Sequence, residues 1–413
     1  MKLTFRIDSL SWRPSLIAAA IVSALVSFAP SRGAGLEQSA ADRLAAVENA
    51  IEPPVVVAGE PPEKWSIEKQ LNHYKVPAVS VAVINDYKID WAKAWGVTEA
   101  GGTQAATKDT LFQAASISKP ISAMAVMHLV QEGKLNLDAN VNDYLKHWKV
   151  PDNQFTRIKP VTFRELLTHS AGISGFFRGY TPESLLPTLT EMLEGVPPAE
   201  NQPVTVLWAP GSKWVYSNAG YGVVQQVVED VTGESFPNFM KTTLLQPLGM
   251  THSTYAQPLP AALKKDAATG TLSNGSELPY KLWVPIPEAA GGLTTTPSDI
   301  AKFAIALMNT GRGQGNPVIS AATGAEMLTP SGIPGGAGQG LGPWLSPSSK
   351  FMGERFSHDG HTPGFETIMI GYLSGRGIVV MTSSDDGMAA TVPIIRAVEH
   401  VYGWKTATDL YEQ

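Results

Sequence analysis

The segments richest in strand-forming residues lie near opposite ends of this 413-residue chain, and most of the sequence between them has helical periodicity. Residues 76–97 carry many β-branched side chains on either side of an Asn-Asp-Tyr-Lys turn, which predicts a hairpin. Residues 366–387 predict a second hairpin that turns at 374–377, followed by an amphipathic helix over about 389–401. This order predicts an α/β (α+β) fold, in which both chain ends build a central antiparallel sheet flanked by helices and a mostly helical lobe is inserted.

The first 33 residues have the pattern of an export signal. Three basic residues, Lys2, Arg6 and Arg13, precede an apolar run over 16–29 that ends in small residues. Because this run is short for a membrane span, we expect cleavage near residue 33, with an uncleaved membrane anchor as the alternative. In both cases the sequence predicts a periplasmic or secreted protein, and cleavage would leave no membrane span.

The remainder of the sequence predicts one domain that follows a linker. Proline-rich sequence before the first predicted helix indicates a linker over 34–65. We expect residues 66–413 to form a single domain, with an α/β lobe over about 66–115 and 285–413 and a helical lobe over about 116–284. The cleft between two such lobes is the natural place for a functional site.

The composition excludes several classes of function. A formal net charge of −6 leaves no basic surface for a nucleic-acid partner. The absence of cysteine excludes disulfides, thiolate nucleophiles and cysteine metal sites. Covalent catalysis in this chain would therefore use oxygen or nitrogen, and no motif indicates a metal or an organic cofactor.

The stretch Ser-Ile-Ser-Lys-Pro predicts a helix that begins with a reactive pair. Because proline is tolerated in the first turn of a helix, Pro120 places the helix start just before it. Lys119 then lies one turn from Ser116, near the free N–H groups of the helix start. Apolar surroundings lower the pKa of a lysine, as a base at neutral pH requires. A second Ser-x-x-Lys, from Ser66 to Lys69, opens a polar helix and is interpreted as a helix cap with a solvated lysine.

The sequence Tyr216-Ser217-Asn218 stands directly before an apolar-periodic helix over 221–231. A tyrosine beside a buried lysine is a candidate general base, because a neighbouring ammonium lowers the pKa of the phenol. Asn218 offers both a donor and an acceptor to an ester or amide. The alternative is structural, with Tyr216 filling the core and Asn218 capping the helix.

The sequence His358-Asp359-Gly360 directly precedes the second hairpin and is expected on a strand or at its mouth. Gly360 would let a ligand approach the backbone, and a strand edge there would offer N–H groups to an oxyanion. The alternative is that His358 and His361 form a metal pair, although no third ligand has a recognisable spacing.

Together these motifs resemble the penicillin-recognising serine hydrolases, which include class C β-lactamases, D-alanyl-D-alanine carboxypeptidases, D-aminopeptidases and family VIII esterases. The resemblance covers nearly all of the chain after the signal and implies a β-lactamase/transpeptidase-like fold. It implies that Ser116 forms an acyl-enzyme, with Lys119 or Tyr216 as the base. It also implies that Asn218 holds the acyl amide and that backbone N–H groups of Ser116 and His361 form an oxyanion hole.

One departure from the family pattern limits the substrate. Where many members have Lys-Thr-Gly, this chain has His358-Asp359-Gly360, and a histidine is mostly neutral at pH 7. We therefore expect a serine hydrolase of esters or of D-amino-acid peptides and amides, rather than one that binds a free carboxylate strongly. The expected partners are small-molecule ester, amide or β-lactam substrates and peptidoglycan peptides. A true β-lactamase or D,D-carboxypeptidase is the alternative, and a non-catalytic penicillin-binding sensor or scaffold is the second alternative.

Other chemistry-bearing residues have structural interpretations. His169, in Leu-Leu-Thr-His-Ser-Ala-Gly, is interpreted as a hydrogen-bonded loop histidine. Four tryptophans are interpreted as core or rim packing, with walls for an acyl group as the alternative: Trp208, Trp214, Trp283 and Trp344.

Overall fold

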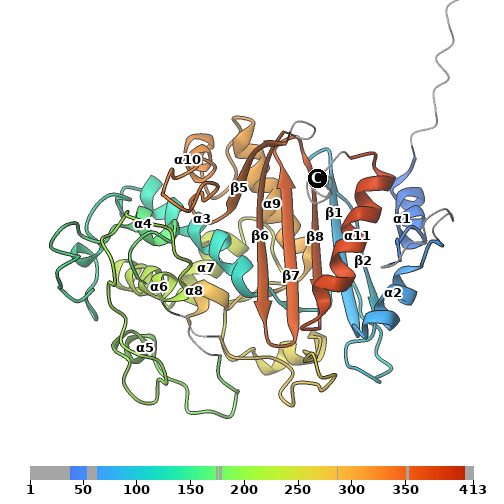
Figure 1. Ribbon diagram of the computed structural model, residues 1–413, viewed down its shortest axis with the longest axis horizontal. Coiled ribbons are helices and arrows are strands. Elements are labelled where there is room, and N and C mark those ends of the chain that lie inside the picture. Colours follow the sequence, from blue (N-terminus) through green and yellow to red (C-terminus); the bar gives the residue numbers. More distant parts are fainter. Residues whose placement is uncertain are drawn as a thin grey trace, which may run out of the picture. The chain divides into compact units, whose positions relative to one another are not determined.

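Six strands form one antiparallel sheet in the order β2-β1-β8-β7-β6-β5, seen face on in Figure 1. The strands are β1 (Ala78–Asn85), β2 (Lys88–Gly96), β5 (Trp344–Ser349), β6 (Gly353–Thr362), β7 (Phe365–Tyr372) and β8 (Arg376–Thr382). The two predicted hairpins are β1–β2 and β7–β8. Because β8 pairs with β1, the two ends of the chain meet in the middle of the sheet, and the predicted fold class is confirmed.

The structure is a computed structural model that describes residues 38–53, 63–173, 175, 179–285, 287–349 and 353–404. The elements discussed below belong to the compact unit Ser39–Gln413. The predicted export signal over residues 1–33 lies outside the described residues. Within the described ranges, no helix combines the length and the apolar character that a membrane crossing needs.

Helices cover both faces of the sheet. Their bounds are α1 (Ala40–Glu48), α2 (Ile67–Tyr74), α3 (Ser118–Gln131), α4 (Phe163–Leu167), α5 (Leu189–Glu194), α6 (Asn218–Thr232), α7 (Phe236–Met240), α8 (Glu288–Gly291), α9 (Pro297–Gly311), α10 (Ala321–Met327) and α11 (Gly387–Val401). Helices α3 to α10 lie between the two hairpins in the sequence, whereas α1, α2 and α11 lie outside them. Helix α11 packs against β7 and β8, and α1 and α2 pack against α11 and β2. Helix α9 packs against β1, β2, β7 and β8.

Strand β1 shows how the sheet separates two apolar cores. Val79, Val81 and Val83 are buried in the core that contains residues of α11, whereas Ala82 and Ile84 are buried in the core that contains residues of α9. Side chains alternate between the two faces of a strand, so a strand that is apolar throughout is covered on both sides. This burial explains why residues 78–84 contain almost no polar side chain.

Part of the predicted linker is folded. Residues 40–48 form α1, which begins with a capping box between Ser39 and Asp42. Val47 and Ile51 are fully buried in the same core as α11. The predicted linker over 34–65 therefore began too early: the proline-rich sequence starts only after Ile51, and α1 lies before it.

A second, two-stranded sheet positions the helix that carries the Ser-x-x-Lys motif. Strand β3 (Phe112–Gln113) pairs with β4 (Thr294–Thr295), and the N–H of Ala114 donates to the carbonyl of Leu293 at 2.9 Å. The chain then enters the 3₁₀ turn η1 (Ala115–Ile117) and continues directly into α3. The segment before Ser116 is thus fixed to the segment that follows α8.

Candidate active site

Ser116 and Lys119 lie together at the start of α3. Ser116 is the middle residue of η1, and Pro120 is the third residue of α3, within the first turn as predicted. The Nζ atom of Lys119 lies 3.0 Å from Oγ of Ser116 and donates to the carbonyl oxygen of Ala290 at 2.8 Å. The lysine side chain is completely buried. A buried amine within hydrogen-bonding distance of a hydroxyl is suited to take the proton of that hydroxyl.

The backbone on either side of Ser116 is held in an unusual conformation. Ala115 has a φ of +45°, in the left-handed region that an L-residue rarely adopts. Strand β6 packs directly against this turn, and a Cβ added to Gly360 would lie 2.2 Å from the carbonyl oxygen of Ala114. Gly360 therefore allows the turn that contains Ser116 to approach β6 closely. The sequence had suggested that Gly360 makes room for a ligand instead.

Tyr216 approaches both members of the pair. Its ring centre is 4.8 Å from Nζ of Lys119, and its phenol is hydrogen-bonded to Ser116. Tyr216 stands two residues before α6, whose cap is Ser217: the Ser217 side chain accepts from the N–H of Gly220 at 2.9 Å. Asn218 is thus the first helical residue rather than the cap.

Burial sets the protonation states of Lys119 and Tyr216. It lowers the pKa of Lys119 well below its ordinary value, and the nearby carboxylate of Asp359 opposes this shift only in part. Burial raises the pKa of Tyr216, although the hydrogen bond with Ser116 acts in the other direction. The expectation that a lysine ammonium lowers the pKa of Tyr216 is wrong: burial raises that pKa, and the group that opposes the shift is Ser116 rather than Lys119. The arrangement therefore favours a neutral amine beside a protonated phenol.

Asn218 lies half-buried at the start of α6, and its side-chain oxygen Oδ1 is an unused acceptor. This atom is buried and has no hydrogen-bond partner among the described residues. Buried amide oxygens are usually hydrogen-bonded, so an unpaired one at a candidate site is suited to accept from a bound molecule.

His358 lies on β6 and is almost fully buried. Its Nδ1 donates to the carbonyl oxygen of Asp359 at 2.6 Å, and its ring is stacked on Trp344 with centres 4.7 Å apart. Burial, together with Lys119, lowers the pKa of His358 to about 3. The imidazole is therefore neutral at pH 7, and it supplies no positive charge at this position of β6.

His361 has a different environment from His358. It is the pair partner of Glu366 on β7, and its exposed side chain lies 3.4 Å from that carboxylate, which raises the pKa of His361. Residues three apart on a strand project from opposite faces, so His358 and His361 are not arranged to bind one metal ion. Within the residues that the structure describes, no cluster of three or more His, Asp or Glu side chains could hold a metal. Strand β5 pairs with β6 only up to Ser357, which leaves residues 358–362 as an edge beside η1.

The second Ser-x-x-Lys is a helix cap, as the sequence indicated. The side chain of Ser66 accepts from the N–H of Lys69 at 3.1 Å, and the Lys69 ammonium pairs with exposed Glu63 at 2.9 Å. Ser66 therefore provides a control position with the same local spacing, beside an exposed lysine instead of a buried one.

Three contributors to the site were missed by the sequence reasoning. The backbone carbonyl of Ala290 accepts a hydrogen bond from Lys119, and no pattern of side chains in the sequence could indicate a backbone acceptor. Asp359 acts on Lys119 through its charge, although the sequence treated it as the middle of a motif. His169 packs its ring on that of Tyr216, with centres 4.4 Å apart. Its signal was a histidine set among small and apolar residues in a tight turn.

Comparison with known proteins places this geometry in a family. A family model described as Beta-lactamase matches residues 66–401. The chain belongs to the β-lactamase family. The match begins at the capping serine of α2 and ends in the last residues of α11, so it includes every site element described above. The family resemblance expected from the motifs is confirmed.

Relatives of known structure share this fold. The octameric penicillin-binding protein homologue from Pyrococcus abyssi aligns with a TM-score of 0.66 at 26% identity, over 82% of this chain and 76% of that chain. D-alanine carboxypeptidase AmpC from Burkholderia cenocepacia aligns with a TM-score of 0.60 at 20% identity, over 82% of this chain and 96% of that chain, which shows the fold alone.

Among curated relatives, penicillin-binding protein 4 of Amycolatopsis lactamdurans is 31% identical over 262 residues, which are 62% of this chain and 65% of that protein. Penicillin-binding protein 4* of Bacillus subtilis is 25% identical over 308 residues, which are 71% of this chain and 65% of that protein. The chain thus spans less than two thirds of the length of these relatives.

Proposed function

We propose that this protein is a serine hydrolase that forms an acyl-enzyme on Ser116 and acts on esters or on D-amino-acid amides and peptides. One observation carries the proposal. The completely buried amine of Lys119 lies 3.0 Å from the Ser116 hydroxyl, and the phenol of Tyr216 is hydrogen-bonded to the same serine.

In the proposed acylation, neutral Lys119 takes the Ser116 proton while Oγ attacks the substrate carbonyl carbon. The tetrahedral intermediate collapses when Tyr216 donates its proton to the leaving oxygen or nitrogen. The Lys119 ammonium then returns a proton to the phenolate, which restores both groups. Deacylation repeats these transfers with water as the nucleophile. This assignment of Lys119 as the base follows from the low pKa of the amine and the high pKa of the phenol.

The substrate preference follows from His358. Because its imidazole is neutral and stacked on Trp344, it offers no ionic partner to a free carboxylate. The unpaired Oδ1 of Asn218 suits an acyl group that carries an amide N–H. Neutral esters and amides therefore fit this site better than substrates that end in a carboxylate.

The names of the relatives support a second candidate, covalent reaction with penicillins, because two of them are called penicillin-binding proteins. Intact mass measurement after incubation with benzylpenicillin separates the possibilities. Turnover without an adduct indicates a β-lactamase, and a persistent adduct without ester hydrolysis indicates a sensor.

The direct test is hydrolysis of p-nitrophenyl butyrate by the purified protein and by two serine variants. We expect Ser116→Ala to lose activity with an unchanged melting temperature and Ser66→Ala to keep it. Undiminished hydrolysis by Ser116→Ala would refute the proposal. We also propose export of the protein, which N-terminal sequencing of the mature chain would test.

A further inference from the structure

We propose that His169 is a positioning residue for Tyr216: its Nδ1 atom and its main-chain carbonyl hold the segment that presents the phenol to Ser116. The inference rests on the proposed function, because it concerns how Tyr216, a proton donor in the proposed reaction, is held in place. The sequence reasoning treated His169 as an ordinary loop histidine.

Two hydrogen bonds connect His169 to the residues on either side of Tyr216. The N–H of Val215 donates to the carbonyl oxygen of His169 at 2.8 Å. The N–H of Ser217 donates to Nδ1 of the His169 ring at 3.1 Å. The Ser217 N–H belongs to the peptide group that directly follows Tyr216, and the Val215 N–H belongs to the peptide group one residue farther back. His169 therefore holds the short backbone segment that carries the Tyr216 side chain.

The ring of His169 also packs on the phenol itself. The two ring centres are 4.4 Å apart with an interplanar angle of 32°, and the imidazole is 3% exposed. Nζ of Lys119 also lies close to the phenol, 4.8 Å from the Tyr216 ring centre. Packing against both an imidazole and an amine restricts how far the phenol can rotate away from Ser116.

The ring is held in one neutral form. Because Nδ1 accepts a hydrogen bond, the proton of the neutral imidazole is on Nε2, a buried atom without a partner among the described residues. Burial, with the nearby Lys119 and His358, lowers the pKa of His169 well below its usual value. A protonated ring would lose the acceptor that Ser217 needs.

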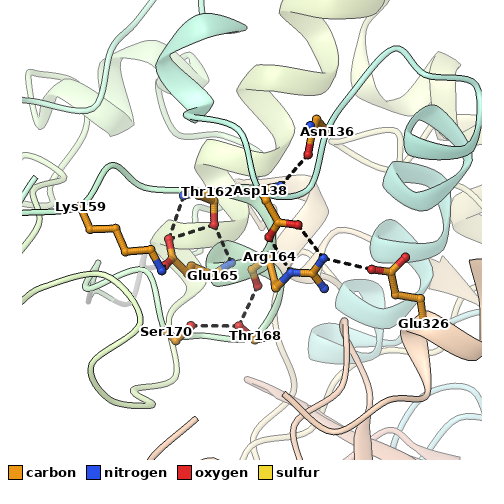
Figure 2. Close-up of polar contacts among 9 residues, drawn as sticks. All are labelled: Asn136, Asp138, Lys159, Thr162, Arg164, Glu165, Thr168, Ser170 and Glu326. Atoms are coloured by element: carbon orange, nitrogen blue, oxygen red, sulfur yellow. Dashed lines mark hydrogen bonds and ion pairs between the residues drawn. The ribbon is translucent and has the colours of Figure 1, made fainter. Parts of the chain in front are cut away.

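The backbone at His169 is strained in a way that aims the ring. Its φ is +56°, in the left-handed region that is uncommon for any residue other than glycine, although asparagine, aspartate and histidine enter it more often than the rest. The turn is tied on both sides, because the hydroxyls of Thr168 and Ser170 lie 3.0 Å apart and Thr168 donates to the carbonyl of Arg164 at 2.7 Å. Figure 2 shows these contacts at the end of α4.

The same network anchors the turn to distant parts of the chain. The Arg164 guanidinium pairs with Asp138 at 2.7 Å and with Glu326 at 3.0 Å, and the Glu165 carboxylate accepts from the N–H of Thr162 at 2.9 Å (Figure 2). A strained conformation persists only where its surroundings enforce it. These contacts hold the turn that contains His169 in its strained conformation, while the His169 ring packs against Tyr216 at the candidate site.

The test compares two variants that differ in which ring nitrogen they replace. In asparagine the carbonyl oxygen is bonded to Cγ, as Nδ1 is in histidine, so His169→Asn keeps the acceptor for Ser217 and tolerates the left-handed backbone. In glutamine the amide is one carbon farther out, so His169→Gln matches Nε2 instead. Phe163→Leu, in α4 and fully buried, is the control for general loosening of this region.

The measurements are kcat and KM for p-nitrophenyl butyrate, normalised to active sites by the p-nitrophenol burst. We expect His169→Asn to keep kcat within about threefold, whereas His169→Gln loses about tenfold or more in kcat with KM nearly unchanged, because a displaced proton carrier slows only the chemical steps. Phe163→Leu should change the melting temperature without lowering kcat per active site.

Equal kcat values for the Asn and Gln variants would overturn the proposal, and so would a kcat loss in Phe163→Leu as large as that in His169→Gln. If His169→Gln fails to fold, His169→Asn decides alone, and its own failure to fold or a tenfold loss of kcat contradicts the proposal. Ser116→Ala separates the two claims: hydrolysis by that variant sinks the proposed function, whereas an inactive Ser116→Ala leaves the positioning role to be judged by the His169 pair.

Discussion

The Nζ atom of Lys119 lies 4.8 Å from the centre of the Tyr216 ring and 3.0 Å from Oγ of Ser116, so one buried amine contacts both oxygen-bearing side chains of the site. Its charge state controls what either oxygen can do. Lys119→Arg, which keeps the positive charge at all accessible pH values, should lower kcat/KM for an ester by about 10³-fold, because no neutral base remains. Near-normal hydrolysis by this variant would show that Tyr216 suffices as the base.

The same lysine makes folding stability depend on pH. The pKa of Lys119 is lower in the folded protein than in the unfolded chain, so the unfolded chain binds more protons between the two values and stability rises with pH there. Lys119→Met removes this dependence and should melt higher than the natural protein, with a gap that widens as the pH falls. Thermal unfolding between pH 5 and pH 9 measures the gap. A gap that is constant with pH would contradict the pKa direction.

His358 determines whether a substrate carboxylate is recognised. His358→Lys introduces an ammonium where family members with Lys-Thr-Gly carry one, and one charge-assisted hydrogen bond corresponds to about tenfold in affinity. We expect kcat/KM for a D-Ala-D-Ala peptide to rise by about that factor relative to its C-terminal amide. Both peptides should be measured with each protein, because loss of the stack on Trp344 lowers all rates together. An unchanged ratio would mean that the charge does not reach the bound carboxylate.

Gly360 is required by the packing of β6 on the turn before Ser116. In Gly360→Ala the new Cβ would meet the Ala114 carbonyl at 2.2 Å, so we expect a loss of about 2 kcal/mol in unfolding free energy and a displaced Ser116. Gly291→Ala is the matched control, because its Cβ would meet nothing nearer than 3.8 Å. Urea unfolding of both variants compares them, and equal midpoints would count against the packing argument.

Glu288 makes a second contribution to pH dependence near the site. It lies in α8, two residues before the carbonyl that binds Lys119, and its carboxylate is bonded to the Gln225 side chain. Burial raises its pKa from 4.5 to about 7, so this group favours folding below pH 4.5 and loses that contribution as the pH rises towards 7. Glu288→Gln should therefore gain melting temperature relative to the natural protein as the pH rises from 4.5 to 8. A difference that does not change with pH would show that Glu288 is not perturbed.

Much of the architecture is predictable because it depends on local signals. The hairpins that became β1–β2 and β7–β8 carry β-branched residues around polar turns, and Pro120 marks the start of α3 to within a few residues. The sequence predicted that both chain ends build one sheet, but not that β8 is the strand that pairs with β1. These two strands are some 300 residues apart, and the order of strands in a sheet has no local signal. Strand β5 was not predicted, because Trp344-Leu-Ser-Pro-Ser-Ser lacks alternation and contains proline, which is tolerated at a sheet edge.

The site shows the same division. Motif spacing nominated Ser116, Lys119 and Tyr216, and the fold brings these three side chains together. Asn218, nominated from the same motif as Tyr216, begins α6 two residues later. The direction of the Tyr216 pKa was predicted wrongly, because a pair argument counts the neighbouring charge but cannot count the water that folding removes. His169 was underestimated for a similar reason: its partners, Val215 and Ser217, are more than forty residues away and contribute only backbone N–H groups.

The most direct measurement of the central claim is covalent labelling with a fluorophosphonate ester, followed by intact mass measurement and peptide mapping. An activated serine reacts with this reagent, whereas a solvated one does not at a comparable rate. We predict a single adduct on the peptide that contains Ser116, and its loss in Lys119→Met. Labelling at another residue, or equally fast labelling of Ser116 without the Lys119 amine, would contradict the account.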